Sequence, residues 1–166
     1  RGAAAPAVEE QKPMPADGNL EGMRILLAED NVINMEIASE ILTRKGINVV
    51  PAWNGREAVE IFKTSRPFTF DAILMDMQMP EMDGCEAARR IRSLERRDAR
   101  QIPIIAATAN AFAEDIARTE EAGMDAHISK PMDYDILCRT LMRLIPAARD
   151  SAAASRAPAQ NDAKPE

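Results

Sequence analysis

Aromatic side chains are scarce in this chain of 166 residues, at 4% of the total. The hydrophobic content of 46% still suffices for a packed core, which Leu, Ile, Met and Ala must therefore build. No apolar run approaches the roughly 20 residues that span a bilayer, and no signal peptide is visible. We expect a single cytoplasmic domain that makes no membrane contact, although a longer parent protein could be anchored to a membrane.

The chain also contains only two cysteines and one histidine, and its net charge is negative. Cys85 and Cys138 each lie on an apolar helical stripe without metal-ligand spacing, which favours reduced packing residues over a disulfide. The single histidine, His127, lies on a predicted strand, so no helix-borne histidine is present to serve a kinase dimerisation domain or a phosphotransfer module. The formal charge of −6 argues against a nucleic-acid partner.

The two ends of the chain differ in composition from its middle. Residues 1–21 combine several prolines with Ala, Glu and Gln, whereas residues 147–166 are largely Ala with scattered charges. Neither end has a sustained apolar period, so we predict a disordered linker and a disordered tail around a folded domain over residues 22–146. Because the chain begins with Arg1 rather than Met, we expect it to be part of a longer polypeptide.

Strand and helix signals alternate five times in the middle of the chain. Such an alternation predicts an α/β fold, a doubly wound five-stranded parallel sheet with helices on both faces. The strand candidates are Arg24–Ala28, Asn48–Ala52, Ala72–Met75, Ile102–Ala107 and Ala126–Ser129.

Apolar stripes at helical spacing predict the helices between these strands. The fourth helix, at about Ala113–Ala122, has a thin stripe of Ala113, Ile116 and Ala117, so it should be weakly held and free to move or to meet partners. The first helix, which should end near Gly46, has a fuller stripe of Ile33, Ile37, Ala38, Ile41 and Leu42.

Acidic residues stand where two of the predicted strands end. Glu29 and Asp30 follow the first strand, and Asp76 follows the third. Ligand sites of parallel sheets lie just outside the carboxyl ends of the strands. If the two strands are neighbours, three carboxylates therefore converge on one crevice, where two of them about 4 Å apart would repel each other by about 4 kcal/mol at an effective dielectric near 20.

A hard divalent cation would turn this repulsion into attraction. Mg²⁺ prefers oxygen ligands, whereas Zn²⁺ would need a nearby Cys or a second His. Two further strands end in Thr108 and Lys130, which offer a hydroxyl and an ammonium at the same edge. A carboxylate beside a divalent ion, a lysine and a threonine is equipped to receive a phosphoryl group.

Four motifs in order carry a resemblance to a known family. They resemble the receiver domain of two-component response regulators over about residues 23–145, and most of all the receivers fused to hybrid sensor histidine kinases. The motifs are Leu26–Asn31 (LLAEDN), Met75–Gly84 (MDMQMPEMDG), Ala107–Asn110 (ATAN) and Lys130–Pro131.

This resemblance implies a flavodoxin-like sheet with strand order 2-1-3-4-5 and a role for each site residue. Asp76 would accept a phosphoryl group from a phosphohistidine of a histidine kinase or a histidine phosphotransfer domain. Asp30, Asp76 and the backbone carbonyl of Gln78 would ligate Mg²⁺, and Glu29 would act through water. Thr108 and Lys130 would bind the phosphoryl oxygens, and the Lys130–Pro131 bond would be cis.

The resemblance also bears on activity and on signalling. The isolated domain would catalyse only its own phosphorylation and dephosphorylation, while the parent protein could be a histidine kinase. Thr108 would couple to the residue three positions before Lys130, where the family usually has Tyr or Phe. Here that residue is His127, so a neutral imidazole would have to swing inward, or the output would not use this switch.

Two other functions fit parts of this pattern. A phosphatase of the haloacid dehalogenase type also uses an Asp nucleophile with Mg²⁺ at a strand end, but it needs an acid two residues later, where Gln78 stands. A degenerate receiver that serves as a scaffold is opposed by the complete site. The arginines between residues 89 and 100 are predicted to form a solvated helix face rather than a basic binding patch.

Overall fold

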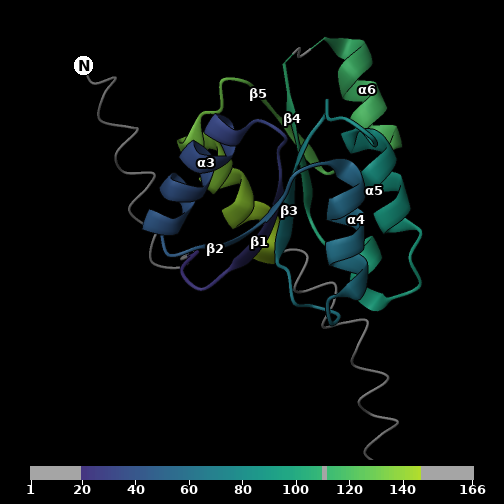
Figure 1. The fold of residues 1–166 in the computed structure, drawn as a ribbon, viewed down its shortest axis with the longest axis horizontal. Coiled ribbons are helices and arrows are strands. Elements are labelled where there is room, and N and C mark those ends of the chain that lie inside the picture. Colours follow the sequence, from purple (N-terminus) through teal and green to yellow (C-terminus); the bar gives the residue numbers. More distant parts are fainter. Residues whose placement is uncertain (1–19, 110–111, 147–166) are drawn as a thin grey trace, which may run out of the picture.

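The computed structural model describes residues 20–109 and 112–146, in which five strands alternate with helices (Figure 1). All neighbouring strands are parallel, and their order in the sheet is β2-β1-β3-β4-β5. This confirms the predicted α/β class and strand order. The strands are β1 (Arg24–Ala28), β2 (Asn48–Ala52), β3 (Ala72–Asp76), β4 (Ile104–Thr108) and β5 (Ala126–Ser129).

Three strand boundaries differ from the prediction: the end of β3 and both ends of β4, which ends at Thr108 rather than Ala107. β3 includes Asp76, so the carboxylate belongs to the strand itself. β4 begins at Ile104 rather than Ile102 because the N–H of Ile102 bonds to the carbonyl of Asp98, and Pro103 has no N–H. The predicted tail and all but the last two residues of the predicted linker lie outside the described residues.

Most helices begin at a side chain that caps them. Asn31, Asn54 and Asp83 each accept a hydrogen bond from the backbone N–H three residues later, and Asp133 accepts from two N–H groups. Of the four α-helices with a defined N-cap, only α6 has no side-chain cap; the 3₁₀ helix η1 also lacks one. The helices are α3 (Val32–Arg44), α4 (Gly55–Thr64), α5 (Gly84–Arg92), the 3₁₀ helix η1 (Arg97–Arg100), α6 (Ala113–Glu121) and a last helix over residues 134–146.

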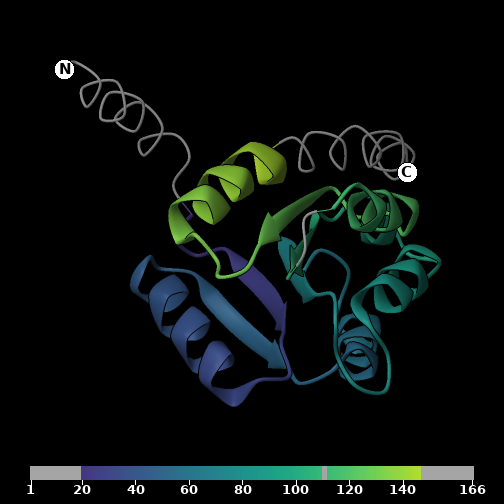
Figure 2. The same cartoon turned by 90° about the horizontal axis from the view of Figure 1, so that it is seen from above.

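The sheet is buried on both faces, which explains why its strands are almost wholly apolar. Seen from above, α3 and the last helix cover one face, and α4, α5 and α6 cover the other (Figure 2). Alternate residues of a strand enter opposite cores: Leu26 packs with Phe62 of α4, whereas Ile25 packs with Leu42 of α3. Each fully buried Leu, Ile or Phe side chain stabilises the fold by about 1.5–3 kcal/mol.

The predicted stripe of the first helix is wrong in part. Ile33 and Ile37 are 64% and 47% exposed, whereas Met35, Ala38 and Leu42 are buried. α3 has apolar residues on two faces, and spacing alone cannot tell which of them meets the sheet. The helix ends as expected, with Gly46 in the left-handed region at φ 87°.

α6 packs weakly on the rest of the molecule, as predicted, but the residue that it buries is not one of the predicted stripe. Its only buried residue is Thr119, while Ala113 and Ala117 are exposed and Ile116 is half-buried. None of the described helices is long and apolar enough to cross a membrane.

The prediction of a solvated arginine face is wrong for two arginines. Arg96 donates to the carbonyls of Phe62, Lys63 and Ser65 at 2.7–3.1 Å and pairs with the buried Asp98 at 2.7 Å. Its guanidinium also lies 4.3 Å from the centroid of the Phe62 ring. Arg92, with 16% of its side chain exposed, binds the carbonyls of Ala99 and Gly123 and the carboxylate of Asp125.

Both cysteines are buried and free, as the sequence predicted. Cys85 of α5 lies in the core on one face of the sheet, and Cys138 of the last helix lies in the core on the opposite face. Burial raises the pKa of each thiol, which lowers the thiolate fraction at neutral pH.

Candidate functional site

The register of the sheet brings the predicted site residues to one edge. Ala28 of β1 pairs with Met75 of β3, so Glu29 follows at the level of Asp76. On the other side of β3, Asp76 pairs with Ala107, and Thr108 comes next in β4. Residues from three adjacent strands therefore meet at the carboxyl end of the sheet.

Three carboxylates cluster at this edge. Glu29, Asp30 and Asp76 each place an oxygen within 4.8 Å of the others, and Glu29 and Asp76 are only 5% and 4% exposed. At this separation each pair of charges repels on the order of 3 kcal/mol at an effective dielectric near 20. Burial raises the pKa of Glu29, the charge of Asp76 raises it further, and a hydrogen bond from the Asn31 N–H at 3.0 Å opposes the rise.

Lys130 supplies the positive charge that faces this cluster. Its Nζ lies 3.0 Å from Oδ1 of Asp76 and 3.7 Å from Oε1 of Glu29. The backbone N–H of Lys130 donates to the carbonyl of Thr108 at 2.8 Å, which joins the ends of β4 and β5. The Lys130–Pro131 bond is cis, as the resemblance implied.

The donor set fits a magnesium ion. All three clustered side chains offer carboxylate oxygens, the hard ligands that Mg²⁺ prefers, and the described residues around them include no Cys or His ligand for a softer metal. The N–H of Gln78 donates to Oδ1 of Asp76 at 3.3 Å. The predicted role of the Gln78 carbonyl as a ligand stays a prediction.

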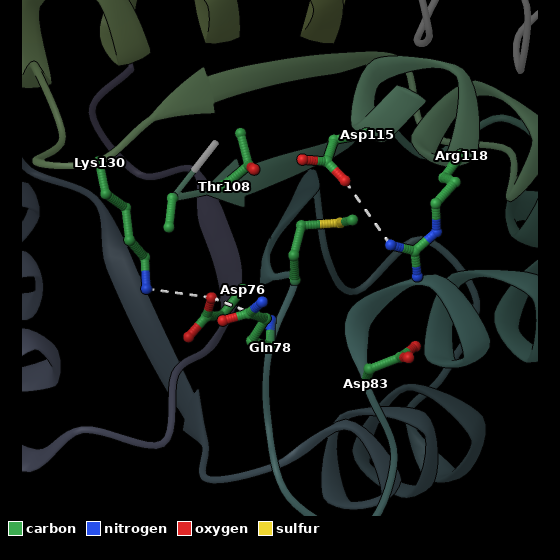
Figure 3. A pocket seen from close by; sticks show the side chains of 9 residues that line it. Asp76, Gln78, Asp83, Thr108, Asp115, Arg118 and Lys130 are labelled. Atoms are coloured by element: carbon green, nitrogen blue, oxygen red, sulfur yellow. Dashed lines mark hydrogen bonds and ion pairs between the residues drawn. The ribbon is translucent and has the colours of Figure 1, made fainter. Parts of the chain in front are cut away.

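A cavity of about 200 Å³ opens beside Asp76 (Figure 3). Since one water accounts for about 30 Å³ of liquid, this space can hold a phosphoryl group together with several waters. The buried Thr108 lies on its wall, as expected from its place at a strand end. The lining residues are Asp76, Met77, Gln78, Asp83, Thr108, Ala109, Asp115, Arg118 and Lys130.

Gly84 allows α5 to begin directly against β3, the strand that carries Asp76. A Cβ at this position would collide with the backbone carbonyl of Asp76 and lie 3.0 Å from Cγ of Met75. The Gly84 N–H also donates to the carbonyl of Met77 at 3.0 Å. Gly84 belongs to one of the sequence motifs, but its role was not foreseen, because this contact arises only from the packing of α5 on β3.

Three charged residues of the cavity were not foreseen, and one of them, Asp83, is the N-cap residue of α5. Asp115 and Arg118 reach the cavity from α6, where they form an ion pair at 3.7 Å (Figure 3). Their i, i+3 spacing was visible in the sequence, but the orientation of α6 was not.

His127 lies apart from this cavity. Its side chain is exposed, and it lines a separate groove of about 320 Å³ together with Thr119, Glu120 and Arg143. In the described structure the imidazole therefore lies outside the pocket that Thr108 lines, and its predicted switch role stays a prediction.

Comparisons with known proteins agree with this geometry. The family model described as "Response regulator receiver domain" matches residues 25–142. Histidine kinase 1 of Arabidopsis thaliana is 35% identical over 156 residues, which covers 76% of this chain and 13% of that protein. Peroxide stress-activated histidine kinase mak1 of Schizosaccharomyces pombe is 38% identical over 112 residues, which covers 67% of this chain and 7% of that protein. The chain spans between 7% and 15% of the length of such curated relatives.

Solved structures are similar over most of their length. The receiver domain of a Pseudomonas aeruginosa sensor histidine kinase, with a magnesium ion coordinated in its active-site cleft, matches with a TM-score of 0.68 at 39% identity, covering 75% of this chain and 98% of that one. The receiver domain of Saccharomyces cerevisiae Ssk1, crystallised with the histidine phosphotransfer protein Ypd1, matches with a TM-score of 0.68 at 29% identity, covering 76% of this chain and 90% of that one.

Proposed function

The chain belongs to the response regulator receiver domain family, and from that membership we propose that Asp76 is the residue that becomes phosphorylated. One observation carries this assignment. The Asp76 carboxylate lies 3.0 Å from the Lys130 ammonium, on the wall of a cavity of about 200 Å³ that Thr108 also lines. The carboxylates of Glu29 and Asp30 each place an oxygen within 4.8 Å of the Asp76 carboxylate.

The transfer uses the Asp76 carboxylate as nucleophile toward a phosphohistidine of a partner. A bond forms between phosphorus and a carboxylate oxygen, while the phosphorus–nitrogen bond breaks and its electron pair leaves with the imidazole. Lys130 neutralises charge on the phosphoryl oxygens, and the Thr108 hydroxyl donates a hydrogen bond to one of them. Glu29, Asp30, Asp76 and the carbonyl of Gln78 would hold Mg²⁺, which supplies further neutralisation of those oxygens.

We propose that the parent protein is a hybrid histidine kinase and that this domain works in the cytoplasm. The support is the identity of the curated relatives, which are histidine kinases several times longer than this chain. Two free buried cysteines agree with a reducing compartment.

An apolar collar around the site supports a protein partner. Within the described residues, all the exposed large hydrophobic side chains lie at the carboxyl edge of the sheet, in or near the first turns that follow β1, β2, β4 and β5. Scattered apolar residues need no explanation, but a group around one site marks an interaction surface. We propose that a histidine phosphotransfer domain docks here. The collar consists of Val32, Ile33, Ile37, Trp53, Phe112 and Ile136.

The phosphatase alternative is not favoured. Its chemistry requires a proton donor two residues after the nucleophile, and Gln78 has no acidic proton to give. The family membership supports phosphoryl storage on Asp76 rather than turnover of a monoester.

Labelling by acetyl phosphate tests the assignment. Wild-type protein with Mg²⁺ should gain one phosphoryl group by intact-mass spectrometry, and hydroxylamine should remove it because it is an acyl phosphate. Asp76→Asn should abolish the gain, as should EDTA, whereas Asp135→Asn, an exposed aspartate of the last helix, should label like wild type. A label that persists on Asp76→Asn would refute Asp76 as the phosphoacceptor.

A further inference from the structure

α6 contributes two charged side chains to the cavity beside Asp76, and neither has a role in the transfer described above. Arg118 and Lys130 are the cations among the described residues that line it, and they stand on opposite sides of the cavity (Figure 3). The middle of α6 lies against the first turn of α5, since the Arg118 carbonyl is 3.8 Å from Sγ of Cys85.

The charge balance of the cavity favours a second cation once Asp76 is phosphorylated. Lys130 already faces two carboxylates, at 3.0 and 3.7 Å. In the acyl phosphate, a phosphoryl group with about 1.5 to 2 negative charges and three acceptor oxygens replaces the single negative charge of the Asp76 carboxylate. A guanidinium presents several N–H donors in a planar fork that matches two phosphoryl oxygens at once.

The present partner of Arg118 holds it only loosely. Nη1 of Arg118 lies 3.7 Å from Oδ1 of Asp115, and 53% of the arginine side chain is exposed. Surface pairs of this kind contribute between nothing and about 1 kcal/mol. Exchange of this carboxylate for a dianionic phosphoryl group therefore costs little and gains a stronger partner.

The contacts of α6 allow its amino end to move with such an exchange. Its first turn has no side-chain cap, and Phe112 before it is 66% exposed. The loop after α6 is held firmly: Arg92 donates to the Gly123 carbonyl at 2.8 Å, Met124 is buried, and Asp125 accepts from the Ile104 N–H at 2.9 Å. The helix is therefore anchored at its carboxyl end and loosely held at the end beside the cavity.

We propose that Arg118 is a second phosphoryl-binding residue, which releases Asp115 on phosphorylation of Asp76 and draws the amino end of α6 toward the site. This rests on the proposed function of Asp76. It assigns α6 a direct electrostatic contact with the phosphoryl group, in addition to any signal that passes through Thr108 and Lys130.

Beryllofluoride with Mg²⁺, a stable mimic of the phosphoryl group on Asp76, provides the first test. Arg118→Ala should bind it about tenfold more weakly than wild type, or weaker still, in an NMR titration, the effect of losing one charged hydrogen-bond partner. Arg89→Ala is the matched control, because Arg89 forms a similar i, i+3 pair at 3.5 Å with Glu86 and does not line the cavity. Equal affinities for the two variants would overturn the proposal.

A double-mutant cycle separates exchange of partners from a general field effect. Asp115→Asn frees Arg118, so it should tighten beryllofluoride binding in the wild-type background and do so much less in Arg118→Ala. An equal gain in both backgrounds would mean that Asp115 acts only by its own charge, and would overturn the exchange.

Backbone amide shifts of α6 complete the test. Beryllofluoride should move the amides of the first turn of α6 in wild type and in Arg89→Ala, and move them far less in Arg118→Ala. Shifts in Arg118→Ala as large as those of wild type would overturn the proposal. Failure of the proposed function would give a different result, because wild type itself would then take no label from acetyl phosphate. If the proposed function holds, Arg118→Ala should still be labelled at Asp76.

Discussion

The Nζ of Lys130 lies 3.0 Å from Oδ1 of Asp76, across β4 from it. This pair joins the end of β5 to the end of β3 through charge rather than through backbone hydrogen bonds. Because phosphorylation changes the charge at Asp76, Lys130 must adjust to it, and β5 follows. The relationship predicts how the site communicates with the rest of the domain.

Replacement of Lys130 by alanine should separate phosphorylation from its structural consequence. Asp76 remains present, so labelling by acetyl phosphate should continue, although more slowly. The amide shifts that phosphorylation causes in β5 should fall to less than about half of the wild-type shifts. Lys45→Ala, at an exposed position, is the control. Shifts equal to those of wild type would contradict a role for Lys130 in coupling.

Replacement of Glu29 by glutamine should stabilise the protein in the absence of Mg²⁺. The raised pKa of Glu29 means that the folded state binds its proton more tightly than the unfolded state does. Wild-type stability should therefore fall as the pH rises from the ordinary value of 4.5 through the raised pKa, and the variant should lack this loss. At pH 7 without Mg²⁺ the variant should therefore unfold at a higher temperature than wild type.

Saturating Mg²⁺ should close this gap, because the cation favours the ionised carboxylate and stabilises wild type more than the variant. Thermal unfolding with and without Mg²⁺, at pH 5 and pH 7, measures both effects. A variant that is less stable than wild type in EDTA at pH 7 would show that the hydrogen bonds of the Glu29 carboxylate outweigh the repulsion and burial that destabilise it.

Replacement of Gly84 by alanine should destabilise the fold by about 1–3 kcal/mol, the usual cost of overpacking. The new Cβ meets the backbone carbonyl of Asp76, which cannot rotate away. Glu86→Ala in the same helix loses only exposed ion pairs and should cost less than about 1 kcal/mol. Urea unfolding of both variants measures the difference, and similar midpoints would contradict the tight contact.

Replacement of Arg96 by alanine should cost about 3–5 kcal/mol of stability. It leaves the Asp98 carboxylate, of which 4% is exposed, without its cation, and it removes the donors to three carbonyls at the end of α4. The exposed Arg97 next to it provides the control, and Arg97→Ala should change the free energy of unfolding by less than about 0.5 kcal/mol. Equal losses in both variants would refute the structural role of Arg96.

Replacement of Ile33 or Ile37 by serine should weaken docking of the partner and leave the chemistry at Asp76 unchanged. Both side chains are exposed on the collar, so the fold should be unchanged. Phosphoryl transfer from a phosphorylated histidine phosphotransfer domain should slow about tenfold, while labelling by acetyl phosphate should stay within about twofold of wild type. Glu40→Ser, elsewhere on the exposed surface of α3, serves as the control. Normal transfer in both isoleucine variants would remove this part of the collar from the docking surface.

The class of fold and the composition of the site could be predicted because both follow from short-range patterns. Apolar strands alternate with helical stripes, and each strand of a parallel sheet ends at the same edge, so polar residues at the strand ends must meet there. Glu29, Asp76, Thr108 and Lys130 were placed together on this ground, and the structure brings them together.

Other features depend on which surfaces meet, and local patterns cannot decide that. α3 has apolar residues on two faces, and only its packing on the sheet buries Met35 and leaves Ile37 exposed. Arg96 and Arg97 are neighbours with equal charge, yet it is Arg96 that binds the carbonyls at the end of α4 and the buried Asp98.

The amino-acid sequence alone thus determined the order of the elements and the chemistry available at the carboxyl edge, since periodicity and strand ends are properties of the chain itself. The tertiary structure decided which helix faces are buried, that Gly84 must lack a side chain, and that Arg118 reaches the cavity. These depend on contacts between residues distant in the chain, and burial and electrostatic energies are set by such neighbours rather than by spacing along the sequence.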